Sequence, residues 1–341
     1  MRKLLNTLYV TRQDAYLRKD GETVAVDIEK KTVLRLPIHT IEGIVTFGNV
    51  MTSPYLLSLC AERGVCVSMM SEHGRFLARV EGPVSGNVLL RMAQMRAHED
   101  PDVKGSLARN FVIGKLCNCR TLLQRRMRDH GETAALKEAE AKHKDVICRV
   151  RESSPETVRI RGLEGESAAV YFGAFNDLLV AQQEDFKMTS RNRRPPLDPM
   201  NALLSFLYTL LSHECRGALE GVGLDPQIGF LHELRPGRPS LALDLMEELR
   251  AVLADRVAVS LVNLRQVVAK DFTVTDSGAV LLSDDARKTV LAVWQKKKQE
   301  QIRHPFLDEQ IPFGLLPHVQ ALLLARHLRG DMDAYPPFFM K

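Results

Sequence analysis

The sequence predicts an α+β protein in which a small N-terminal β-sandwich is followed by a larger, all-α unit. Short runs rich in β-branched residues, separated by turn residues, dominate the first part of the chain, and apolar residues at helical spacing dominate the rest. Strands and helices grouped in separate blocks indicate separate domains rather than a doubly wound sheet. The 341 residues, of which 45% are hydrophobic, suffice for two domains, and the change in pattern places them at residues 1–85 and 86–341.

The strands of the first domain are predicted from short runs of Val, Ile, Leu and Tyr. Asp20 and Gly21 favour a tight turn between two of these runs, because this dipeptide tolerates positive φ angles. Ser53 and Pro54 are instead typical of the start of a helix, which we place at residues 53–63. The predicted strands are 4–10, 15–18, 23–28, 32–37, 43–47, 65–70 and 75–80.

The second domain is predicted to be built from helices, with one short hairpin around Asp276 and Gly278. A proline-containing loop at 190–199 interrupts the helical pattern, and Asp198 or Asn201 is expected to cap the helix that follows. The predicted helices are 88–99, 101–130, 132–151, a helix containing Glu164 that reaches about 183, 200–219, 241–255, 258–270, 283–301 and 315–329.

Composition and spacing exclude several classes of protein. No run approaches the ~18 apolar residues of a membrane span, and motifs for nucleotide hydrolysis, a dinucleotide cofactor or zinc proteolysis are absent. The 6 cysteines lack zinc spacing, which indicates an intracellular protein with free thiols, and we expect it in the cytoplasm. Net charge is only +5, but arginines cluster at 120–128 and 191–194; such clusters bind polyanions or form solvated helix faces.

Two carboxylates, Asp244 and Glu247, are the strongest indication of chemistry. Their spacing on a predicted helix places them on one face, roughly 5–6 Å apart. They lie beside the apolar stripe of this helix, where a buried carboxylate pair is costly without a cation. Glu248 and Arg250 are predicted to be ordinary exposed charges.

His232, shortly before this helix, and Glu164, in a separate helix, complete the set of candidate ligands. Carboxylates with one imidazole suit a divalent cation that also holds a phosphate oxygen, so the set indicates metal-assisted phosphodiester chemistry. Each residue also has a simpler interpretation: Glu164 as a first-turn carboxylate favoured by the helix dipole, and His232 as a core or loop histidine. Glu166 should face away from Glu164, so only one of the two is expected at the site.

Polar residues near these candidates have plausible supporting roles. Arg235 and Arg238 lie in the loop between His232 and the acidic helix, where a phosphate would be held, and Ser240 is a predicted N-cap. A polar stripe on an otherwise apolar helix needs partners in the site or in the core. This stripe consists of Asn201, Ser205 and Tyr208.

Four blocks of the sequence resemble the Cas-one family, the CRISPR-associated integrase/endonucleases of spacer acquisition. The resemblance extends over the whole chain, and the ending YPPFF (335–339) is similar to the type I-C subgroup. The blocks are GLEG (162–165) with AAVYF (168–172), RPPLDPMNALLS (194–205), GFLH (229–232) and SLALDLMEELR (240–250).

The resemblance implies a catalytic helical domain and a homodimer formed largely through the β-domains, with two such dimers bracketing a Cas-two dimer in a heterohexamer. It implies that Glu164, His232 and Asp244 bind Mg²⁺ or Mn²⁺. Glu247 aligns with a second helix acid that is often Asp in the family, so it is expected to bind the metal or to hold its neighbours.

The implied reaction is transesterification, in which the 3′-hydroxyl of a prespacer attacks a phosphodiester at the leader–repeat boundary of a CRISPR array. His232 is expected to act as a ligand or a proton relay. Two alternatives remain open: a metal-dependent nuclease that cuts branched DNA in repair, and a non-catalytic nucleic-acid scaffold. The candidates for DNA phosphate contacts are Arg193, Arg194, Arg235 and Arg238.

Overall fold

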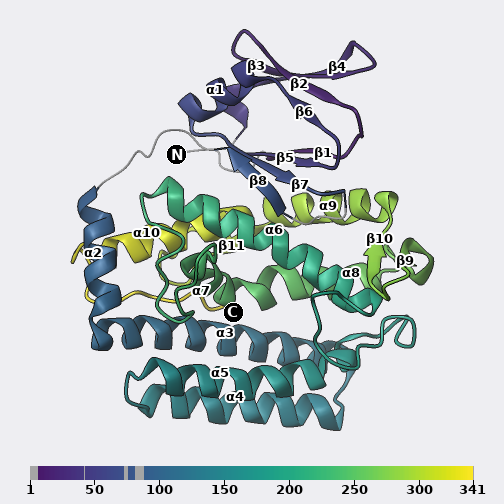
Figure 1. The fold of residues 1–341 in the computed structure, drawn as a ribbon. Helices are drawn as coiled ribbons and strands as arrows, with labels where there is room; N and C mark the ends of the chain where they lie inside the picture. Colours follow the sequence, from purple (N-terminus) through teal and green to yellow (C-terminus); the bar gives the residue numbers. More distant parts are fainter. Residues whose placement is uncertain (1–6, 42, 73–75, 81–87, 341) are drawn as a thin grey trace. The chain divides into compact units, whose positions relative to one another are not determined.

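The computed structural model describes residues 7–41, 43–72, 76–80 and 88–340. The chain divides into two compact units, Met1–Gly86 and Asn87–Lys341 (Figure 1). In the part that the structure describes, no helix combines the length and apolarity needed to cross a membrane.

Two four-stranded sheets form the N-terminal unit, in the orders β1-β5-β7-β8 and β4-β3-β2-β6. Apolar side chains from both sheets and from α1 (Pro54–Arg63) form one core, which includes Leu17, Ile44 and Leu56. This confirms the predicted strand-rich unit; the predicted strands at 4–10 and 75–80 begin outside the described residues. The strands are β1 (Thr7–Val10), β2 (Tyr16–Asp20), β3 (Thr23–Ile28), β4 (Lys31–Pro37), β5 (Gly43–Phe47), β6 (Met51–Thr52), β7 (Cys66–Met70) and β8 (Phe76–Val80).

The C-terminal unit is largely helical, with the predicted hairpin and a second one, β11 and β12, that the sequence did not predict. The long helix α3 packs against α4 and α5 and against α7, and α6 packs against α7 and α10 (Figure 1). The helices are α2 (Val88–Glu99), α3 (Pro101–His130), α4 (Ala134–Glu152), α5 (Thr157–Gly173), α6 (Pro199–Gly221), α7 (Ser240–Leu249), α8 (Arg256–Asn263), α9 (Asp284–Gln299) and α10 (Leu316–Leu328). The strands are β9 (Phe272–Val274), β10 (Val280–Leu282), β11 (Gln301–Arg303) and β12 (Gln310–Pro312).

Helix starts follow the expected capping chemistry in some places and depart from it in others. Asp198, one of the two predicted caps of α6, accepts a hydrogen bond from the backbone N–H of Asn201 (2.8 Å). The prediction that Ser240 caps α7 is wrong. Its hydroxyl donates to the Glu233 carbonyl (2.9 Å) and accepts no helical N–H. The helix with Glu164 starts at Thr157 and ends at Gly173, so Glu164 lies in mid-helix rather than in a first turn.

Two helix ends were predicted too late. α5 is followed by a 3₁₀ turn, η2 (Phe175–Leu178), and α8 ends at Asn263. The sequence did not indicate either end, because neither place carries a proline that would stop a helix. The continuous helix predicted at 241–255 instead changes at Arg250 into a π-helical segment, η3 (Arg250–Asp255). Such π segments are rare and often mark functional sites.

Glu248 contradicts the prediction that it is an exposed charge, because it is fully buried on α7. Its carboxylate accepts hydrogen bonds from the Tyr335 hydroxyl (2.5 Å), the Phe338 N–H (2.7 Å) and Gln320 (3.0 Å). Asn118 of α3 donates to the Phe338 carbonyl (2.9 Å) and accepts from the Met340 N–H (2.7 Å). The final residues of the chain are therefore tied to α3 and α7 by buried polar bonds.

Gly105 of α3 should not tolerate alanine, because a Cβ there would lie 1.5 Å from the carbonyl oxygen of Pro155. That neighbour is backbone and cannot rotate away, so we expect Gly105→Ala to destabilise the protein by about 1–3 kcal/mol. Gly217→Ala on α6 is the matched control, since its Cβ would meet nothing within 4 Å and should be neutral or stabilising. Thermal unfolding of both variants checks this; equal melting temperatures would contradict the close packing.

Glu248 should make stability depend on pH. Burial raises its pKa to about 8 from 4.5, against the three hydrogen bonds that favour the carboxylate. Between these values the folded chain keeps a proton that the unfolded chain has lost, so stability falls as pH rises from about 4.5 through 8, by at most about 1.4 kcal/mol per pH unit. Urea unfolding across this range should give a flatter profile for Glu248→Gln than for the wild type; parallel profiles would contradict the assignment.

Candidate metal centre

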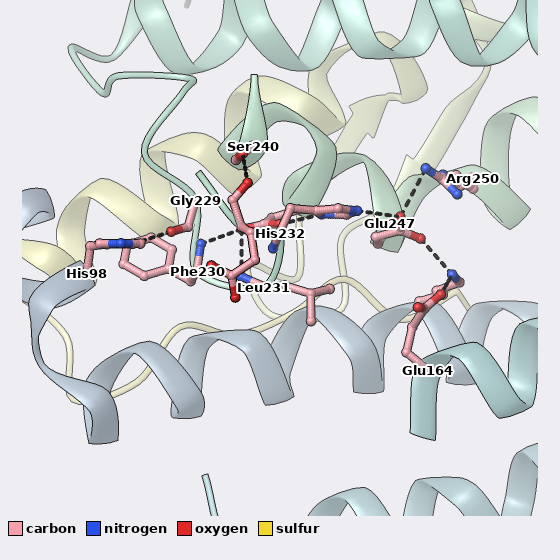
Figure 2. Close-up of polar contacts among 12 residues, drawn as sticks. His98, Glu164, Gly229, Phe230, Leu231, His232, Ser240, Glu247 and Arg250 are labelled. Atoms are coloured by element: carbon pink, nitrogen blue, oxygen red, sulfur yellow. Dashed lines mark hydrogen bonds and ion pairs between the residues drawn. The ribbon is translucent and has the colours of Figure 1, made fainter. Parts of the chain in front are cut away.

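Four predicted site residues from three segments of the C-terminal unit are connected by short contacts, and Figure 2 labels three of them, Glu164, His232 and Glu247. Glu164 lies on α5, His232 on the loop before α7, and Asp244 and Glu247 on α7. A fifth residue, Lys115 of α3, lies among them and was not predicted.

Asp244 is fully buried, and both of its carboxylate oxygens are engaged by the His232 loop. One oxygen accepts the N–H groups of Phe230 (2.6 Å) and Leu231 (3.0 Å). The other accepts the His232 N–H (2.9 Å) and lies 2.7 Å from His232 Nδ1. Asp244 therefore fixes the loop backbone and the imidazole ring at the same time.

This contact explains the glycine of the GFLH block. A Cβ at Gly229 would lie 2.8 Å from Asp244 Oδ2 and 2.7 Å from the backbone carbon of Ser240. A side chain at this position would push the loop away from α7. Gly229 is therefore needed for the close approach that lets three consecutive backbone N–H groups reach one carboxylate.

The Asp244 contact also sets the tautomer of His232. A carboxylate oxygen accepts, so Nδ1 carries the proton, which leaves the lone pair of Nε2 free. Nε2 lies 3.8 Å from Glu247 Oε1. The imidazole thus turns the nitrogen that is free to bind a metal toward Glu247, and its other nitrogen is held by an acid in the manner typical of histidine ligands.

Glu247 and Glu164 share one cation, the ammonium of Lys115. Lys115 Nζ lies 2.8 Å from Glu247 Oε2 and bonds directly to Glu164 Oε1. Burial alone would lower the pKa of Lys115, but the charges of Glu247 and Glu164 outweigh it and raise that pKa. Burial likewise opposes ionisation of Glu247, and the cations Arg250 and Lys115 reverse this and lower its pKa.

Arg250 links the site to the polar stripe of α6. Its guanidinium lies 3.0 Å from Glu247 Oε1 and 4.9 Å from the centre of the Tyr208 ring. Because Arg250 pairs with Glu247 and lies over the Tyr208 ring, the prediction of Arg250 as an exposed charge is wrong. Tyr208 in turn donates its hydroxyl proton to Asp255 (2.6 Å). Asn201 and Ser205 lie further out, where both accept hydrogen bonds from Arg191.

The four predicted phosphate-contact arginines lie on two loops near the site. Arg193, Arg194 and Arg235 are exposed and Arg238 is half-buried. Burial lowers the pKa of Arg238, and the charges of Arg235, Arg193 and Arg161 lower it further, so these cations lie close enough to repel one another. An anion among them would relieve that repulsion.

The donor chemistry of the site fits a hard divalent cation. Two carboxylates already share a positive charge, the Lys115 ammonium, and one imidazole nitrogen lies 3.8 Å from the second of them, Glu247. Across the described ranges, however, no three His, Cys, Asp or Glu side chains converge closely enough to form a ready-made cage. A metal between Glu164 and Glu247 requires the ammonium to leave that space.

Lys115 is the main functional residue that sequence reasoning missed. Its signal was present: a lone lysine interrupts the apolar run VIGKL at 112–116, on a helix whose neighbours there are buried. Such a lysine needs a carboxylate partner.

The chain is similar to known proteins over its whole length. A family model described as CRISPR associated protein Cas1 matches residues 8–296. CRISPR-associated endonuclease Cas1 2 of Rhodospirillum rubrum is 52% identical over 347 aligned residues, covering 100% of both chains. CRISPR-associated endonuclease Cas1 1 of Chlorobaculum tepidum is 51% identical and 99% of each chain is covered.

Solved structures share the fold at lower identity. A Cas1 protein from Thermotoga maritima has a TM-score of 0.83 at 21% identity, covering 97% of this chain and 99% of that chain. A casposase bound to integration product has a TM-score of 0.82 at 22% identity, covering 96% and 92%. A Cas6-RT-Cas1–Cas2 complex gives 0.83 at 20% identity, covering 99% of this chain and 37% of that one. With the family match and the end-to-end identity of the named relatives, this shows that the chain belongs to the Cas1 family of CRISPR-associated endonucleases.

Proposed function

We propose that this Cas1-family enzyme acts in CRISPR adaptation as an integrase that joins prespacer 3′-hydroxyl ends to the leader–repeat of a CRISPR array. The observation that carries the proposal is that Glu164 and Glu247 share the Lys115 ammonium, while His232 Nε2 lies 3.8 Å from the other oxygen of Glu247. The relation to named endonucleases supports phosphodiester chemistry there. The ending at 335–339 supports the type I-C subgroup.

We assign the metal-binding role to Glu164, His232 and Glu247, and a positioning role to Asp244. The reason is that both Asp244 oxygens already accept hydrogen bonds from the His232 loop, whereas Glu164 and Glu247 contact only cations and His232 in the site. Mg²⁺ or Mn²⁺ suits these donors and would stabilise the charge that develops on the phosphoryl oxygens. Asp244 remains essential in this scheme because it aims Nε2.

The reaction forms a bond from the prespacer 3′-oxygen to phosphorus and breaks the bond to the 3′-oxygen of the target strand. The attacking hydroxyl gives up its proton and the leaving oxygen gains one. His232 is the group at the site suited to moving a proton, because Asp244 holds its Nδ1 and leaves the lone pair of Nε2 free to accept one. Lys115 and Arg250 supply buried positive charge beside the reacting phosphate.

DNA is the proposed substrate, and a homodimer bound to a Cas2 dimer is the proposed assembly. The mutually repelling arginines beside His232 support binding to phosphates. The likeness in fold to a casposase on its integration product and to a Cas1–Cas2 complex supports the substrate and the partner. Dimerisation through the N-terminal unit and catalysis by the C-terminal unit complete the proposal.

Removing either metal-binding acid should abolish joining. We expect Glu164→Gln and Glu247→Gln to lower prespacer joining to a repeat-bearing plasmid, with Cas2 and Mn²⁺ present, by about 100-fold or more. Glu166→Gln is the matched control, because Glu166 is two residues away on α5 and pairs with Arg149 and Lys142 outside the site. Undiminished joining by the first two variants would refute the assignment, and cleavage without joining by the wild type would favour the branched-DNA nuclease.

The arginine cluster should account for part of the salt dependence of DNA binding. Each lost phosphate contact reduces the slope of log affinity against log salt by about 1, so we expect Arg238→Ala and Arg193→Ala each to weaken binding and flatten that slope. Arg303→Ala, on β11 and paired with Asp308, is the control that should leave the slope unchanged. Fluorescence anisotropy across a salt series measures it; slopes equal to the wild type would contradict the contacts.

A further inference from the structure

Gln94 of α2 is a fully buried polar residue outside the site just described. Its amide nitrogen donates to the carbonyl oxygens of Asp225 (2.8 Å) and Ile228 (2.8 Å). Its amide oxygen accepts the Asp225 N–H (2.9 Å). One side chain therefore satisfies three backbone groups of a single turn that lies 131 residues further along the chain.

This turn, residues 225–229, leads directly into the metal centre. Its Pro226 carbonyl accepts the N–H groups of Leu241 (2.9 Å) and Ala242 (3.2 Å) in the first turn of α7. The turn is thus held by α7 on one side and by Gln94 on the other. The next three residues along the chain donate their N–H groups to Asp244.

A second residue of α2 contacts the end of the same turn. His98 Nδ1 lies 2.6 Å from the Gly229 carbonyl oxygen (Figure 2). A carbonyl only accepts, so Nδ1 carries the proton in this contact. The His98 ring also lies against Phe230, with 6.5 Å between ring centres.

We propose that Gln94 is a positioning residue of the metal centre, acting through the 225–229 turn. By fixing this turn from α2, it presents the 230–232 amides to Asp244 and so holds His232 Nε2 toward Glu247. A neutral amide suits this task, because it donates and accepts at once without adding a buried charge. The inference rests on the proposed function, because that proposal identifies the centre as a metal site. The hydrogen bonds by which Gln94 holds the 225–229 turn do not depend on it.

The first experiment tests the hold by hydrogen exchange. Gln94→Met keeps the length and burial of the side chain but removes all three hydrogen bonds. Leu90→Ala is the control, since Leu90 is buried one helical turn earlier on α2 and makes no side-chain hydrogen bond to the turn. We expect faster amide exchange at residues 225–232 in Gln94→Met, and exchange there close to wild type in Leu90→Ala, when both are compared at equal distance below their melting temperatures.

The second experiment measures the affinity of the full chain for Mn²⁺ alone by titration calorimetry. Loss of an outer residue that orients a ligand costs about 10-fold or more in metal affinity, so we expect that loss for Gln94→Met and not for Leu90→Ala. Wild-type exchange in Gln94→Met, or faster exchange with unchanged Mn²⁺ affinity, would overturn the positioning role. If the wild type bound no Mn²⁺, the proposed centre itself would fail, and the exchange data would still decide whether Gln94 holds the turn.

Discussion

Four carboxyl groups buried along one continuous helical stretch, α7 and η3, determine how the C-terminal unit is arranged. A carboxylate in the interior is costly unless hydrogen bonds or cations compensate it, and each of these acids draws its compensation from a different part of the chain. Asp244 binds the His232 loop, Glu247 binds cations from α3 and η3, Glu248 binds the chain end and α10, and Asp255 binds tyrosines of α5 and α6. Packing around α7 is therefore as much polar as apolar.

Spacing along this helix was the most informative part of the sequence. It indicates which face of the helix a residue lies on, but not which groups its side chain contacts. The i, i+3 relation of Asp244 and Glu247 correctly indicated that both face the interior. It could not show which oxygens are already used, because that depends on how the preceding loop folds back to bring three backbone N–H groups to Asp244. Strands such as β3 and β5 matched their predicted ranges, since alternation and turn residues are local signals. The lone lysine in the apolar run at 112–116 indicated that Lys115 needs a partner but not which one, and the sequence carries no local signal for the contacts of Gln94.

Glu247 and Glu248 show how far neighbouring residues of one type can differ. A helix turns about 100° per residue, so Glu247 faces the cations Lys115 and Arg250, while Glu248 points in another direction, toward uncharged donors from α10 and residues 335–338. Cations lower the pKa of Glu247, whereas burial raises that of Glu248. The prediction of Glu248 as an exposed charge failed because the apolar stripe of α7 was taken as its only buried face, while the helix is enclosed on nearly every side.

The bonds between Glu248, Asn118 and residues 335–340 have a consequence for how the protein is made. During synthesis, α3 and α7 emerge from the ribosome long before the segment that completes the hydrogen bonds of Glu248. Until residues 335–338 have been added, the Glu248 carboxyl lacks two of its three partners, the Tyr335 hydroxyl and the Phe338 N–H. The helix that carries the proposed site residues Asp244 and Glu247 therefore depends for part of its polar contacts on residues 87 and 90 positions after Glu248.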